Sequence, residues 1–170
     1  MSKRIAALLF LGVLALAAGC RDSGKESEFF AISGKLFVFN YRVATATYLV
    51  VLKPLQPMDG NQTAVASFEN PAGGDPIVVR QKVWPQLDKV TLESPPLQCV
   101  KKDRPYRVSI RIEDGGALKQ LIETTMKSTE DQSILPDEPL VAGPTYTPNP
   151  DLVGHPGGKL DDPDKFVCPA

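Results

Sequence analysis

The feature that most constrains the fold of this chain is a segment in which apolar and polar residues alternate strictly. Between Tyr106 and Glu113, apolar residues occupy the even positions, and polar or charged residues lie between them. Strict alternation predicts a strand of an antiparallel sheet with one buried face and one wet face. A tight turn, Asp114-Gly115-Gly116, follows. The next segment, residues 118–127, is therefore predicted to be the second strand of a hairpin.

Five segments upstream have the same extended character, and proline and glycine turn signals separate them. They occupy residues 31–41, 43–52, 64–68, 77–84 and 90–92. No segment after residue 20 has a convincing helical pattern. Seven short strands separated by turns predict an all-β fold, an antiparallel β-sandwich of the immunoglobulin-like or fibronectin-III-like kind.

The first twenty residues have the pattern of an export signal. Lys3 and Arg4 precede an apolar stretch, residues 5–16, and the small residues 17–19 lead into Cys20. The apolar run is too short for a confident membrane-spanning helix, and its flanks are those of a secretory signal. Its end resembles the lipobox of bacterial lipoproteins, which implies cleavage before Cys20 and acylation of that cysteine. The alternatives are an ordinary signal peptide with an incidental cysteine, or an N-terminal anchor helix.

Acylation of Cys20 would make the mature protein a domain held on a membrane outside the cytoplasm, because each buried methylene contributes about 0.8 kcal/mol. In enterobacterial lipoproteins an Asp after the acylated cysteine favours the inner membrane. Arg21 stands there in this chain, so the resemblance implies the outer membrane, with the domain facing the periplasm. We expect residues 1–19 to be the signal peptide and residues 20–30 to be a polar, flexible tether.

Cysteine usage agrees with an oxidising compartment. Of three cysteines, Cys99 and Cys168 remain once Cys20 is assigned to lipid. Two remaining cysteines in such a compartment predict a disulfide, with two separate thiols as the alternative. From residue 130 onward, prolines punctuate a segment with few large apolar residues. We therefore predict a sandwich domain over residues 31–129 and an extended, proline-rich tail over residues 130–170 that the disulfide staples to the domain.

The sequence offers no constellation that predicts catalysis, a metal site or a cofactor. His155 is the only histidine and lies among glycines, and a Gly-x-Ser-x-Gly nucleophile motif is missing. The 19 basic and 20 acidic residues nearly balance, so charge gives no reason to expect a nucleic-acid partner. We predict a protein that is not an enzyme and that carries no cofactor.

Three segments are similar to strands of a known lipoprotein family. They are residues 32–38 (ISGKLFV), 46–52 (ATYLVVL) and 106–112 (YRVSIRI), the last followed by its hairpin. They resemble the YbaY and YscW lipoproteins, a group that includes the pilotin chaperones of type III secretion. The resemblance covers residues 32–129. It implies binding of an outer-membrane secretin subunit and assistance in its membrane assembly, and it identifies no site residues.

The function expected from these features is protein–protein interaction at the bacterial envelope. The protein is predicted to be a chaperone, pilotin or scaffold of an envelope assembly, anchored by lipid on Cys20 and bound to an envelope protein. One alternative is a structural envelope lipoprotein without a dedicated client. Another is a small-ligand or glycan-binding module, for which Trp84, Tyr106 and Tyr146 are the candidate aromatic residues. Clustering of these rings in one concave groove would favour the glycan alternative, and their dispersal would count against it.

Overall fold

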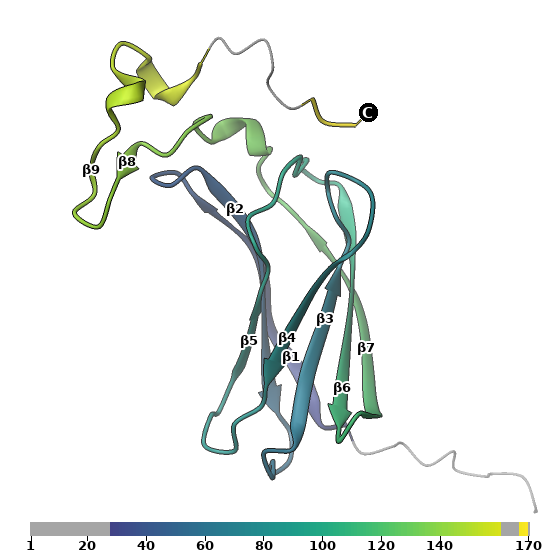
Figure 1. Cartoon of the computed structure of the whole chain (residues 1–170). Helices are drawn as coiled ribbons and strands as arrows, with labels where there is room; N and C mark the ends of the chain where they lie inside the picture. The colour runs from purple at the N-terminus through teal and green to yellow at the C-terminus, as the bar shows by residue number, and fades with distance from the viewer. Residues whose placement is uncertain (1–27, 161–166, 170) are drawn as a thin grey trace, which may run out of the picture.

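A computed structural model describes residues 28–160 and 167–169 (Figure 1). Seven strands form its body: β1 (Phe30–Asn40), β2 (Thr45–Pro54), β3 (Gln62–Phe68), β4 (Ile77–Lys82), β5 (Val90–Glu93), β6 (Pro105–Asp114) and β7 (Ala117–Lys127). Five short elements follow: η1 (Gln132–Ile134), β8 (Val141–Ala142), β9 (Thr147–Pro148), η2 (Pro150–Leu152) and η3 (Pro156–Gly158). The predictions for the signal peptide and Cys20 lie outside the described residues. Within the described residues, no helix has the length and apolarity needed to span a membrane.

The seven strands form two antiparallel sheets that face each other. One sheet has the order β1-β2-β5 and the other has the order β4-β3-β6-β7, while β8 and β9 form a separate small ribbon. All strand pairs in both sheets are antiparallel. The predicted all-β sandwich is therefore confirmed, and each expected strand is present at its expected place in the sequence.

Alternation along the strands builds the core between the sheets. In β2, the four inward residues Ala46, Tyr48, Val50 and Leu52 are fully buried. In β6, four residues are buried in the same way: Tyr106, Val108, Ile110 and Ile112. The residues between them are exposed or partly exposed. Burial of one face of each sheet removes apolar surface from water, which is the main favourable contribution to folding.

A bulge in β1 changes which of its apolar residues face the core. The register shifts between Ile32 and Gly34, so that Ser33 is an extra residue opposite β2. One extra residue reverses the direction of every following side chain. Ile32 and Phe37 consequently both pack against the core, although they lie five positions apart. Leu36 points to the other face and is about half exposed.

The open seam between the sheets, where β1 runs beside β7, is closed by side chains. The Gln120 amide accepts hydrogen bonds from the backbone N–H groups of Phe29 and Phe30 and donates one to the Phe30 carbonyl, each at 2.8 Å. Further along the seam, Lys35 Nζ donates to the Thr124 hydroxyl and, at 2.7 Å, to the Thr125 carbonyl. These bonds satisfy edge groups that would otherwise be free to pair with another chain.

The strand registers give the sandwich two distinct ends. At one end lie the starts of β1 and β3, the ends of β2 and β4, and the β6–β7 turn. We call this end, with loops 55–61 and 83–89, the N-terminal pole. The opposite end carries the β1–β2 turn, the loop at 94–101 and residues 131–160, which we call the cap. Figure 1 shows the cap (green to yellow) beyond the upper ends of the strands; we call this end the cap pole.

The start of β6 is fixed by a tyrosine whose ring is in the core. Tyr106 is fully buried, and its hydroxyl oxygen accepts a 2.7 Å hydrogen bond from the backbone N–H of Lys101, five residues upstream. A tyrosine at this corner, bonded back to the preceding loop, is a hallmark of immunoglobulin-like sandwiches. The bond holds the loop at 94–101 against the body, and that loop also contacts the cap.

Replacement of this tyrosine tests the contribution of the corner. Tyr106→Phe keeps the ring but leaves the partly buried Lys101 N–H without its acceptor, so we expect a loss of about 1–3 kcal/mol in the free energy of unfolding. Urea denaturation followed by circular dichroism measures it. Tyr41→Phe, at a half-exposed position in the β1–β2 turn, is the matched control and is expected to change little. Equal effects of the two substitutions would contradict the assigned role.

Candidate functional site

The cap is joined to the body by Gln132, which forms hydrogen bonds through both its backbone and its side chain. The backbone N–H of Gln132 donates to the Val100 carbonyl at 2.9 Å, and its side-chain oxygen accepts from the Val100 N–H at 3.0 Å. Its side-chain nitrogen donates to the Leu97 carbonyl at 2.7 Å. A fourth hydrogen bond lies further away, where the Leu140 N–H donates to the Arg42 carbonyl in the β1–β2 turn at 2.9 Å.

Within the cap, one ion pair and one glycine hold distant segments together. Lys159 Nζ donates to the carbonyls of Ser133 and Leu135 and lies 3.3 Å from Asp137 Oδ1. Gly158 is buried, has a φ of +68°, and leaves only 2.6 Å between an added Cβ and the Cβ of Pro136. Any larger residue at Gly158 would therefore separate the two halves of the cap.

A disulfide joins Cys99 of the body to Cys168 of the tail, as the cysteine usage predicted. Cys99 follows the Pro95-Pro96 corner closely and is buried, while Cys168 is partly buried. Cys99 has a φ of +66°, an unusual conformation for a residue with a Cβ. In the chain-entropy account, a cross-link over so long a loop contributes at most about 4 kcal/mol.

The disulfide lies on the wall of a groove between the cap and the body. The groove has a volume of about 730 Å³. Its walls come from the β1–β2 turn, the loop after β3, the loop at 94–101, the first residues of the cap, and the end of the described tail. No local sequence pattern predicts this groove, because its lining comes from positions as far apart as Ala44 and Cys168.

Charges of both signs line the groove. The Asp131 carboxylate accepts a hydrogen bond from the Ser133 N–H, and this bond, with help from the nearby Lys101 ammonium, holds the pKa of Asp131 below its ordinary value. Lys101, Gln98 and Glu138 are exposed. Such a lining can donate and accept hydrogen bonds to a polar chain. Among the described residues, no group of three or more His, Cys, Asp and Glu side chains is placed to hold a metal ion.

The three candidate aromatic residues do not gather in one groove. Tyr106 is in the core, with its ring 6.1 Å from that of Tyr48. Trp84 lies in the loop between β4 and β5, with Lys82 Nζ 4.5 Å from its ring centre. Tyr146 is exposed in the cap beside Arg42. None of the three lines the groove described above, and their dispersal counts against the glycan-binding alternative.

The basic residues around β6 form local ion pairs rather than an uncompensated positive surface. Arg104 and Arg107 both pair with Glu69, at 3.2 and 3.4 Å. The pKa of Glu69 is lowered, chiefly because its carboxylate accepts a hydrogen bond from the backbone N–H of Arg107. On the same outer face, Glu113 pairs with Arg80 and Arg111. The side chains of this face are an ordinary solvated network.

The fold and the tyrosine corner place this chain in the class of immunoglobulin-like β-sandwiches, here with an added cap and a disulfide-linked tail. Comparison of the chain with protein-family models and with curated proteins finds no match.

Removal of the Gln132 side chain tests whether the cap is held independently of the disulfide. Gln132→Ala leaves the Leu97 carbonyl and the Val100 N–H without partners, so we expect a loss of about 1–3 kcal/mol in the free energy of unfolding, with the disulfide intact. Urea denaturation measures it under non-reducing conditions. Gln98→Ala, at an exposed position on the same loop, is expected to have an effect near zero. A neutral Gln132→Ala variant would show that the Gln132 side chain is not needed to hold the cap against the body.

Proposed function

We propose that this protein is a lipid-anchored bacterial envelope lipoprotein that binds a protein partner in the groove at the cap pole. The observation that carries the proposal is the position of the groove. The described chain begins beside the N-terminal pole, at Glu28, and the groove lies at the opposite end of the sandwich. A domain tethered through its N-terminus to an outer membrane would present this groove to the periplasm.

The composition of the groove favours a polypeptide as its ligand. Its volume alone is also within the range of small-molecule sites, but the described residues that line it include no aromatic side chain. Aromatic rings supply much of the contact area for sugars and drug-sized ligands. A lining of prolines, small apolar residues and both charge signs is better matched to an extended chain, whose backbone offers donors and acceptors along its length.

A chaperone or scaffold of an envelope assembly is the role that fits such a site. The strand edges at the β1–β7 seam are occupied by Gln120 and Lys35, so partner recognition by strand addition is disfavoured there. The groove is fixed by the Gln132 bonds and by the disulfide. A preformed site loses little conformational entropy when it binds a partner. The weaker alternative is a structural lipoprotein without a dedicated client.

The lipid anchor is tested at its cysteine. Because acylation requires the Cys20 thiol, Cys20→Ser is expected to yield an uncut, unacylated precursor that still folds through its sandwich domain. Intact-mass spectrometry of the protein from its host distinguishes the precursor from the acylated mature form. Normal processing of Cys20→Ser would contradict the lipoprotein assignment.

The binding site is tested by site-specific cross-linking in the native host. A photo-reactive amino acid is introduced at Gln98 or at Glu138, both exposed in the groove. We expect each to form an adduct with the same envelope protein. The matched control position is Glu123, exposed on the outer face of β7, where no such adduct is expected. Mass spectrometry identifies the partner.

Two results would count against this assignment of the groove. Equal adduct formation from Glu123 and from the groove positions would indicate non-specific proximity. Absence of adducts from both groove positions in a properly acylated protein would favour the structural alternative.

A further inference from the structure

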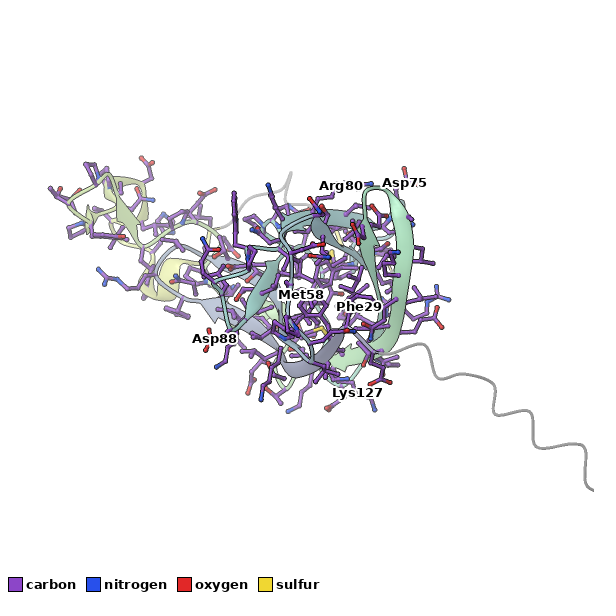
Figure 2. All side chains as sticks on the ribbon, turned by 90° about the horizontal axis from the view of Figure 1, so that it is seen from below. Phe29, Met58, Asp75, Arg80, Asp88 and Lys127 are labelled. Carbon is purple, nitrogen blue, oxygen red and sulfur yellow. A yellow bond between two sulfur atoms is a disulfide. The ribbon has the colours of Figure 1, made fainter. Side chains whose placement is uncertain are left out.

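The N-terminal pole presents a group of exposed apolar side chains on loops. Leu55 is 50% exposed, Trp84 is 45% exposed and Leu87 is 47% exposed. All three belong to the loops 55–61 and 83–89, which join strands at this end of the sandwich. We call these three residues the pole patch. In the view of Figure 2, which looks onto this end, Phe29 and Met58 occupy the middle of the pole and Asp88 lies at its rim.

The loops that carry the pole patch are fixed by the body of the domain. The Leu55 N–H donates to the Phe29 carbonyl at 2.9 Å, and the Leu87 N–H donates to the Trp84 carbonyl at 3.0 Å. Next to Trp84, Val83 is fully buried, and its N–H donates to the Gln62 carbonyl at 3.0 Å. The first residue of each loop, Leu55 and Val83, is thus hydrogen-bonded to the body of the domain.

The two loops that carry the patch also approach each other closely. A Cβ added at Gly60 would lie 3.1 Å from Pro85 Cγ. Gly60 has a φ of +86°, a conformation that glycine adopts without strain. A substitution at Gly60 would therefore both strain its own loop and press on the loop of Trp84.

Lysines accompany these apolar residues. Lys82 Nζ lies over the Trp84 ring at 4.5 Å, and Lys53 and Lys89, exposed, flank the two loops. Tryptophan with flanking lysines is typical of the membrane–water interface, where the indole ring sits at headgroup level and lysine stems extend along apolar surface. Asp59 and Asp88 are exposed nearby, so the pole is close to neutral and its attraction to lipid is mainly apolar.

The short segment between Cys20 and the first described residue, Glu28, would keep this pole near a lipid anchor on Cys20. Glu28 is the first described residue, and Phe29 contributes to the pole itself. Eight residue steps separate Cys20 from Glu28, and a fully extended chain spans at most about 3.6 Å per residue, or about 30 Å in all. A lipid on Cys20 would hold the pole within that distance of the bilayer, at a high effective concentration.

We propose that the pole patch docks on the headgroup region of the lipid bilayer as a second membrane contact. The inference rests on the lipid anchor of the proposed function. One acyl-bearing residue leaves the orientation of a domain free, whereas insertion of the side chains of Leu55, Trp84 and Leu87 fixes one pole against the membrane. The groove at the opposite pole then points directly away from the bilayer.

The single tryptophan makes the contact measurable in the full chain. All tryptophan emission comes from Trp84. The lipidated protein is reconstituted into phosphatidylcholine vesicles with and without bromine on the upper part of the acyl chains. We expect brominated lipid to lower the emission about twofold, since the indole would lie at the interface. High salt is expected to leave this quenching unchanged, because the docking is mainly apolar.

Matched variants separate docking from simple tethering. Leu55→Ser combined with Leu87→Ser is expected to remove most of the quenching while vesicle flotation is retained. Val78→Ser is the control, because Val78 is 55% exposed on β4, away from the pole, and it is expected to leave quenching unchanged. The same variants report folding through their circular dichroism spectra.

The outcomes for the patch and for the anchor are distinct. If the protein floats with vesicles while its emission is unaffected by brominated lipid, the proposed docking of the pole patch is overturned. The assignment of the lipid anchor then still stands. The Cys20→Ser chain, which keeps residues 1–19, gives a second measurement. Quenching of Trp84 in the vesicle-bound Cys20→Ser chain would support docking of the pole patch in the absence of a lipid on residue 20. Unquenched emission in that vesicle-bound chain would overturn the docking proposal.

Discussion

The structure depends on one side chain that joins the two sheets, Tyr48. Its ring stacks on Phe68 at 4.9 Å and lies 4.6 Å from the ring of Phe37, so it contacts residues from both sheets. Its hydroxyl donates to the Glu69 carbonyl at 2.9 Å. Burial raises the pKa of Tyr48 well above its ordinary value, so the hydroxyl stays protonated and remains a donor. The ring supplies apolar contact, and the hydroxyl fixes the turn after β3.

The cap pole is organised from this core outward. Tyr106 packs beside Tyr48 and holds the loop at 94–101 through the Lys101 N–H. That loop in turn binds Gln132 and carries Cys99. A groove built on such a sequence of contacts keeps its shape without a ligand, because each layer is fixed by the one beneath it. Preorganisation of this kind suits a site that recognises a polypeptide.

The two poles of the sandwich have different surfaces, and a domain tethered to a membrane through its N-terminus would use each surface for a different contact. Apolar side chains on short loops gather where the described chain begins, and mixed charges line a groove at the other end. Our proposals assign the first surface to lipid and the second to a protein partner. A domain held at both its anchor and its pole patch would present its groove at a fixed distance and direction from the membrane.

The sequence by itself determined the seven strands and the fold class, because alternation and turn residues are local signals. It also predicted the pairing of Cys99 with Cys168, because only two cysteines remained in an oxidising compartment. Only the tertiary structure decided that Ser33 is a bulge, that Gln132 pairs with the loop at 94–101, and that Gly60 lies against Pro85 of another loop. The physical reason is that side-chain direction after a bulge, and contacts between residues tens of positions apart, depend on how the sheets pack, and no local pattern encodes them.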